Sequence, residues 1–239
     1  QAAKMILTDD NFATLVSAVE LGRDIYRRIS SYIRLQLSVL SSVLQLMLLA
    51  TIFNINEGVA LFPMMLLFCK LFVVVAIVIG FIADVRDPGV MEVPPRRPGT
   101  RIVNSRTIPR WAITGFLVAI PALLVLVYGP DEPSTTQAST SMTMAFAVVA
   151  LSSVNIGLVL RRERRAWFSQ PAFPYLGWIA LGWLLTWAAV ELGMLQRVLV
   201  TVSLQGSDWL IVIGLSLIGA LYNELDRLYR VRRGIQLFG

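Results

Sequence analysis

The sequence contains no histidine and one cysteine, Cys69, in 239 residues. Without histidine the chain lacks the commonest transition-metal ligand and the usual proton shuttle near neutral pH, which argues against metal catalysis and haem ligation. A single cysteine within an apolar run provides no disulfide framework. No nucleophile, base and acid are arranged as hydrolysis requires. The sequence therefore predicts no catalytic residue, no metal ligand and no cofactor.

Charged residues are also scarce, at 15% of the chain, whereas hydrophobic residues make up 56%. The mean hydropathy is +0.69, which is outside the range of soluble globular domains. The net charge of +6 does not indicate nucleic acid, because the basic residues form short clusters beside hydrophobic runs rather than one face with interleaved aromatics. The predicted partner is the lipid bilayer, and no nucleic acid.

Six hydrophobic runs each approach the ~20 residues with which a helix crosses ~30 Å of hydrocarbon. Placing both termini and the connections 84–110 and 161–174 on one side gathers every Lys and Arg there except Lys70 and Arg197. By the positive-inside rule, that side is the cytoplasm. We predict an all-α integral membrane bundle of six transmembrane helices with both termini cytoplasmic, in a bacterial-type inner or plasma membrane. The predicted spans are about 32–53, 59–83, 111–128, 142–160, 175–195 and 209–222.

Residues 1–30 differ from the membrane domain predicted for residues 31–239. Residues 5–8 (MILT) have the pattern of a short strand, and Asp9, Asp10 and Asn11 supply a helix N-cap before an amphipathic run. An isolated strand and helix have nothing to bury against, so this stub is either the edge of a missing soluble domain or a helix on the membrane surface. The start at Gln1 leaves open whether the chain is processed or is a segment of a longer one.

Four stretches resemble a known family in the order in which they occur. They are TDDNFATLVSAVELGRDIYRRISSYIRLQLS (8–38), DPGVMEVPPRRP (87–98), TMAFAVVALSSVN (143–155) and ELGMLQRVLVTVSLQGSDWL (191–210). Together they are similar to the C-terminal membrane half, the fifth to tenth transmembrane helices, of class II P-type cation ATPases, the calcium- and sodium-pump group. The resemblance implies that residues 1–30 end a phosphorylation domain. The family's DKTGT and TGDGxNDA motifs do not occur, so these residues cannot bind and hydrolyse ATP by themselves.

The resemblance also implies where a cation would bind, and these positions have lost the family's ligands. The fifth-helix Asn and Glu match Leu40 and Val43. The sixth-helix Asn, Thr and Asp match Lys70, Val73 and Val74, and the eighth-helix Glu or Gln matches Ser153. Calcium takes six to eight oxygen ligands, and no carboxylate remains at these six degenerate cation-site positions. Ile77 stands in place of the family's helix-breaking Pro, so we expect a continuous helix there.

Lys70 is an ionisable residue inside the run 66–84, where a charge costs from about 2.5 kcal/mol upward. One interpretation is a tethered cation that fills the former ion site. Another is snorkelling, since Lys70 lies ~10 residues, or ~15 Å, from the non-cytoplasmic end of its helix. A third is pairing with Glu191, the candidate charge partner near the outer end of the fifth span. If no partner exists, Lys70→Met leaves the chain folded and inserted.

Polar side chains form two further patches within the spans. We expect them to hydrogen-bond between helices rather than to bind a ligand. The arginine clusters are explained by topology, although they could also hold anionic lipid headgroups. The first patch contains Ser38, Ser41, Ser42 and Gln45, and the second contains Ser152, Ser153 and Asn155.

Two functions remain open from the sequence. The first is a non-catalytic pseudoenzyme, a structural or accessory subunit of a larger membrane complex, which the loss of every cation ligand favours. The second is the C-terminal segment of an intact pump with an atypical ion site, whose catalytic domains lie upstream. The start at Gln1, inside a family domain, favours this second reading.

Overall fold

The computed structural model describes residues 12–85, 88–91, 107–161 and 173–233. The predicted strand at residues 5–8 lies outside them. All regular elements of the described residues are helical, namely α1 (Phe12–Ile52), η1 (Ile55–Gly58), α2 (Pro63–Phe68), η2 (Cys69–Val74), α3 (Val75–Ala83), η3 (Pro88–Met91), α4 (Ile108–Tyr128), α5 (Thr140–Leu160), α6 (Phe173–Glu191), α7 (Gly193–Leu199) and α8 (Gly206–Arg233).

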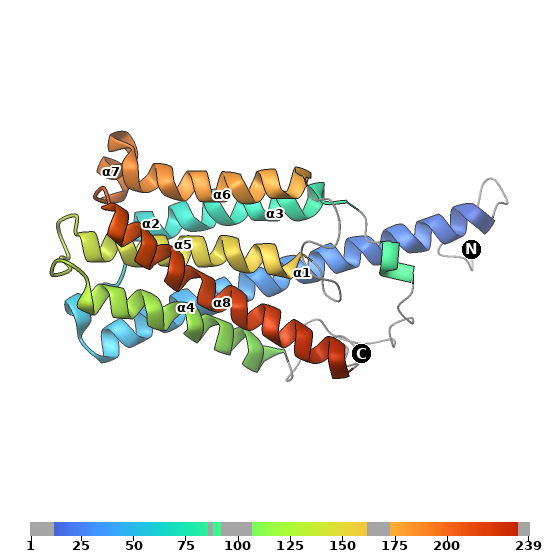
Figure 1. Cartoon of the computed structure of the whole chain (residues 1–239), viewed down its shortest axis with the longest axis horizontal. Coiled ribbons are helices and arrows are strands. Elements are labelled where there is room, and N and C mark those ends of the chain that lie inside the picture. The colour runs from blue at the N-terminus through green and yellow to red at the C-terminus, as the bar shows by residue number, and fades with distance from the viewer. Residues whose placement is uncertain (1–11, 86–87, 92–106, 162–172, 234–239) are drawn as a thin grey trace, which may run out of the picture.

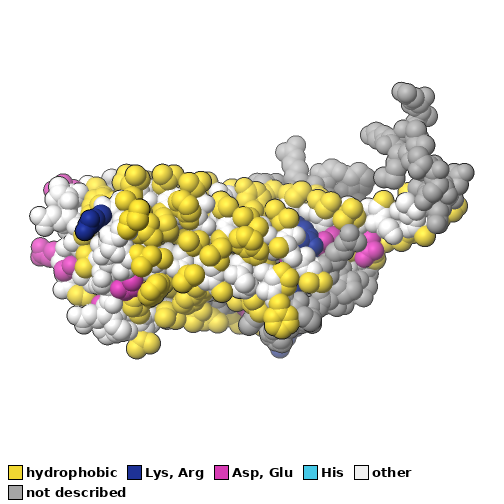
Figure 2. All heavy atoms as spheres, turned by 90° about the horizontal axis from the view of Figure 1, so that it is seen from above, with side chains coloured by type: hydrophobic (Ala, Val, Ile, Leu, Met, Phe, Trp, Pro, Cys, Tyr) yellow, Lys and Arg dark blue, Asp and Glu magenta, His cyan; other side chains and the backbone are white. Residues whose placement is uncertain are grey.

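Six helical segments of the described residues are long and apolar enough to cross a membrane, which confirms the predicted fold class. They lie side by side, and α1 begins at the same end of the bundle at which α8 finishes (Figure 1). We call this the terminal end and the opposite one, which carries α7, the distal end. Hydrophobic side chains cover the middle of the face in Figure 2, and charged side chains lie toward the two ends. The cytoplasmic location of the termini stays a prediction.

The first helix is much longer than the predicted span. A single helix, α1, includes both the amphipathic run that follows Asn11 and the first hydrophobic span, so it crosses the predicted domain boundary at residue 30 without interruption. No proline breaks it, and its one glycine, Gly22, is tolerated within a helix. The N-terminal part of α1 projects beyond the other helices at the terminal end (Figure 1).

Helix α5 forms the centre of the bundle. Nearly all of its side chains are buried, and it packs against α8, α4, α6, α1 and η2. A helix that is apolar on all sides is one that neighbours surround completely. Close approach depends on glycines, since a Cβ on Gly157 would clash with Ile77 and one on Gly182 would come within 3.0 Å of Val154.

The last two spans differ from their predicted bounds. The fifth span ends at Glu191 rather than near residue 195, because the chain turns at Leu192 and forms the short helix α7, which Val200 caps in a left-handed conformation. The sixth continues to Arg233 instead of stopping at residue 222. The charged residues after 222 are unfavourable in hydrocarbon but are compatible with a helix, so helix α8 extends beyond its hydrophobic span.

Candidate functional site

The helix that carries Lys70 is continuous but not regular. Segments α2, η2 and α3 form one run, and the residues flanking η2 keep right-handed helical angles, with φ −59° at Phe68 and −63° at Val75. Between them, Cys69–Val74 is a π-helical turn, a rare form that often lies at functional sites. Continuity was predicted from the sequence, whereas the wider turn was not, because no Gly or Pro marks it. Lys70 therefore sits on the irregular part of its helix.

The structure brings some of the six cation-site positions together and separates others. Lys70, Val73 and Val74 lie on η2, which packs against α5, the helix of Ser153. Val73 and Val74 are buried in the apolar core, and the Ser153 hydroxyl donates to the Val149 carbonyl of its own helix at 2.8 Å. The remaining two positions are on α1, which packs mainly against α4.

On α1, Val43 is partly buried against the core, whereas Leu40 lies on the outer surface with 45% of its area exposed. An exposed leucine contributes neither an oxygen ligand nor a wall to a shared site. On the two elements that do pack together, η2 and α5, these positions offer two valines, an ammonium and one hydroxyl that is bonded within its own helix, so they supply few oxygen ligands for a cation.

The Lys70 ammonium is buried and has no hydrogen-bond partner among the described residues. Its side chain as a whole is partly exposed, but Nζ itself does not reach the surface. Snorkelling would place Nζ at the surface, so this arrangement does not match that interpretation.

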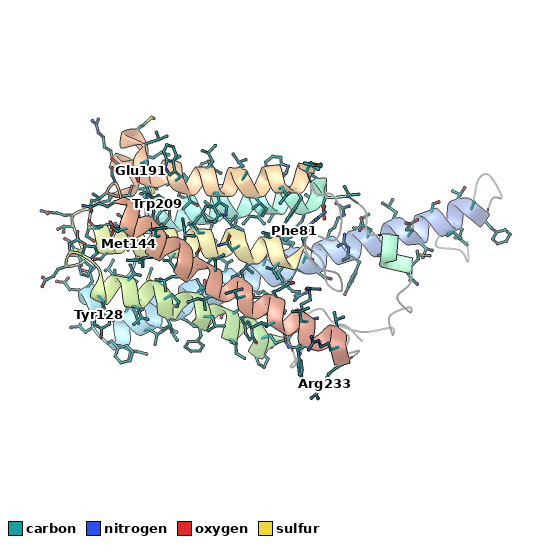
Figure 3. The ribbon with its side chains drawn as sticks, viewed as in Figure 1. Phe81, Tyr128, Met144, Glu191, Trp209 and Arg233 are labelled. Atoms are coloured by element: carbon teal, nitrogen blue, oxygen red, sulfur yellow. The ribbon has the colours of Figure 1, made fainter. Side chains whose placement is uncertain are left out.

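The predicted pairing of Lys70 with Glu191 is wrong for this structure. A Glu191 carboxylate oxygen, Oε1, accepts from Trp209 Nε1 at 3.0 Å and from the backbone N–H of Leu204 at 3.3 Å. Glu191 and Trp209 lie together at the distal end, where α6 ends and α8 begins (Figure 3). Because α6 ends at Glu191, four residues before the predicted end of this span, the carboxylate lies beside the start of α8. The Trp209 indole and the Leu204 backbone N–H satisfy it there.

The polar patches do connect helices, although not through every member. Asn155 Nδ2 donates to the Ser216 hydroxyl at 3.0 Å, which joins α5 to α8. Gln45 Nε2 donates to the Ala112 carbonyl at 3.1 Å, which joins α1 to α4. By contrast, the Ser42 hydroxyl donates to Val39 of its own helix, and the buried Ser152 hydroxyl has no partner among the described residues. Interhelical bonding is thus confirmed for Asn155 and Gln45.

A buried ion pair at the terminal end was not predicted from the sequence. Arg161, at the end of α5, donates through Nε and Nη2 to the Asp84 carboxylate at the end of α3, at 2.9–3.1 Å. The two side chains are 1% and 3% exposed. The guanidinium also lies over the Tyr175 ring of α6, 5.4 Å from its centroid, and that ring stacks on Phe81. Three helices therefore meet around one desolvated pair.

Helix α1 adds two more arginines to this cluster. The buried Asp24 carboxylate accepts from Arg27 at 2.9 Å and from Arg28 at 2.8 Å. Arg28 then donates to backbone carbonyls at the end of α3, and Arg27 donates to the Arg161 carbonyl at the end of α5. The i, i+3 and i+4 spacing of Asp24, Arg27 and Arg28 signals an intrahelical ion pair in the sequence. The arginine clusters were explained by membrane topology alone, so this ion pair was not predicted.

Comparison with known proteins agrees with this architecture. The family described as "Cation transporting ATPase, C-terminus" matches residues 58–229. The chain is 27% identical to calcium-transporting ATPase 1 of Schizosaccharomyces pombe over 98% of its own length and 26% of that protein. It is 29% identical to a calcium-transporting ATPase of Bacillus subtilis, over 91% of the chain and 24% of that protein. For calcium-transporting ATPase type 2C member 2 of mouse, the identity is 28% over 96% of the chain and 24% of that protein.

The chain therefore spans about a quarter of the length of these curated relatives. The match extends over most of the bundle, from just before α2 to near the end of α8. The likeness predicted from four short stretches thus extends along the whole chain, and this protein belongs to the class II P-type cation-transporting ATPase family, of which it corresponds to the C-terminal membrane half.

Proposed function

We propose that this chain is the C-terminal transmembrane segment of a P-type cation-transporting ATPase in which the Lys70 ammonium takes the place of a bound cation. The observation that carries the proposal is the Lys70 Nζ atom, which is buried on a π-helical turn with no partner among the described residues. An ionisable group held at such a cost within a membrane span is a candidate for function.

The electrostatics of the site favour this assignment over binding of a free cation. A second cation would lack oxygen ligands at Val73 and Val74, whose side chains are buried in the apolar core. It would also be repelled by the ammonium, by about 4 kcal/mol per unit charge at 4 Å and an effective dielectric constant of 20. The lysine supplies positive charge without an ion having to enter.

Turnover by the intact protein tests the proposal. With a tethered cation, ATP-dependent phosphorylation of the wild type proceeds without added calcium, sodium or potassium, and Lys70→Met abolishes this cation-free reaction. Arg197→Met is the matched control, because Arg197 is an exposed cation on α7. A wild-type reaction that requires added calcium would contradict the proposal, as would equal effects of the two substitutions.

A second candidate is a non-catalytic accessory subunit. The absence of any carboxylate at the six cation-site positions supports it. The denatured mass of the natural polypeptide separates the candidates. A mass near 26.5 kDa would exclude the pump, whereas a mass roughly four times larger, as the relatives' length implies, would exclude the accessory subunit.

A further inference from the structure

We propose that Asp24, Arg27 and Arg28 form a clamp through which the ends of α3 and α5 are held to α1 and move with it. We refer to these three residues as the α1 clamp. The inference rests on the ion pairs and hydrogen bonds at the terminal end, and it does not depend on the proposed role of Lys70.

Arg28 forms the connection to α3. Its Nη1 donates to the carbonyls of Phe81 and Ile82 at 2.8 and 2.6 Å, and its Nη2 donates to the Asp84 carbonyl at 2.8 Å. The last carbonyls of a helix have no partner within the helix and carry the negative end of its dipole. A guanidinium that accepts no hydrogen bonds but donates several therefore suits this end of α3.

Arg27 forms the equivalent connection to α5. Its Nη1 donates to the Arg161 carbonyl at 3.0 Å, immediately after the last residue of α5. One turn further along α1, the Ser31 hydroxyl donates to the preceding carbonyl, that of Leu160, also at 3.0 Å. Neighbouring positions on one face of α1 thus cap two different helices.

Asp24 is the positioning residue of the α1 clamp. It is 2% exposed, and its two carboxylate oxygens bind one arginine each, Oδ1 to Arg27 and Oδ2 to Arg28. Adjacent guanidinium groups repel each other, and a carboxylate between them both offsets that repulsion and restricts their rotamers. Removing the Asp24 charge therefore releases both arginines together.

The ion pair between Asp84 and Arg161 completes the assembly by joining the two capped ends to each other. Elsewhere α1 packs mainly against α4 and much less against α3. The α1 clamp is therefore the principal polar link from α1 to the continuous helix that contains Lys70. A displacement of the part of α1 that projects beyond the other helices in Figure 1 is transmitted through Arg28 to that helix and through Arg27 to the central helix α5.

Backbone hydrogen exchange of the intact protein in detergent tests the inference, with mass spectrometry of peptides covering residues 76–85 and 154–161. In Asp24→Asn we expect exchange at both helix ends to accelerate roughly tenfold or more, because charge-assisted caps are lost at both. Glu20→Gln is the matched control, one turn earlier on α1 and without an ion pair to the described residues, and it leaves both peptides unchanged.

Two single substitutions test the connections to α3 and to α5 separately. They also serve as the test if the Asp24→Asn variant does not fold. Arg28→Gln accelerates exchange in residues 76–85 only, and Arg27→Gln in residues 154–161 only. The inference is overturned if the changes stay within α1, if either arginine variant affects both ends equally, or if Glu20→Gln reproduces the effect. Because the readout needs no ATP or ion, its failure is distinct from failure of the proposed function.

Discussion

At the scale of single residues, Lys70 places an ionisable group inside a membrane span. Its Nζ is buried without a partner among the described residues, so replacing it removes a cost and breaks no ion pair. We expect Lys70→Met to raise the free energy of unfolding in detergent by about 2 kcal/mol, whereas Lys70→Arg, which keeps the charge and adds volume, lowers it. Chemical denaturation of the intact protein measures both. A loss of stability in Lys70→Met would show that the ammonium is paired after all.

Asp131 gives a residue-scale prediction with a pH dependence. Its carboxylate accepts from the backbone N–H groups of Thr140 and Ser141 at 2.7 and 2.8 Å, at the start of α5. Burial alone would raise the pKa of Asp131, but these hydrogen bonds outweigh it and hold the pKa below its usual range. A lowered pKa means that the stabilisation is complete above the unfolded-state pKa and is lost as the pH falls through the folded-state value.

We therefore expect Asp131→Asn to lower the free energy of unfolding by about 1 kcal/mol at pH 7, as the loss of a helix cap does. The difference from wild type should shrink on acidification below about pH 4. Thermal unfolding across that pH range provides the measurement, and Glu132→Gln, the exposed neighbouring acid, is the control. An equal loss at all pH values would mean that the charge of Asp131 does not matter.

The sequence identified Lys70 as the residue to explain but could not identify its surroundings. An isolated cation in an apolar run can be identified from a hydropathy plot. Whether another residue lies close enough to pair with it depends on where the neighbouring helices end. Glu191 was a reasonable candidate for a span reaching residue 195. The turn at Leu192 ended that span earlier and placed the carboxylate against Trp209 instead.

At the scale of elements, close helix contacts depend on small residues. Between α1 and α4, a Cβ on Gly115 would lie 2.7 Å from the Ser41 hydroxyl oxygen and 3.0 Å from its backbone carbonyl carbon. Backbone atoms of a packed helix do not shift easily, so Gly115→Ala should lower the free energy of unfolding by about 1–3 kcal/mol. Gly214→Ala on α8 meets nothing within 4 Å and should cause no loss. Equal stability of the two variants would refute this account of the α1–α4 contact.

Helices were the most predictable elements, for a physical reason. A run of about 20 apolar residues in a bilayer must satisfy its backbone internally, so its length and composition determine a helix. The π-helical turn at Cys69–Val74 leaves no comparable signal, because it depends on packing against neighbouring helices. The Asp84–Arg161 pair was hidden for the same reason, since its members are 77 residues apart.

At the scale of the whole molecule, the bundle is organised around α5, with ionic connections at its terminal end and the π-helical turn that carries Lys70 in its interior. The family match over residues 58–229 covers the last five of the six candidate spans in the described residues. The six-span architecture of a cation-transporting ATPase's C-terminal membrane half is thus present in the described residues, whereas the loss of oxygen ligands at Lys70, Val73 and Val74 stays a prediction.

Calcium binding to the intact protein tests most directly whether Lys70 has replaced a bound ion. We expect equilibrium dialysis with radioactive calcium to show no saturable binding below about 1 mM, the range that covers even weak protein calcium sites. The combined substitutions Lys70→Asn, Val73→Thr and Val74→Asp should create binding by restoring oxygen ligands. Saturable micromolar binding by the wild type, lost in Val74→Leu or Lys70→Met, would contradict the account.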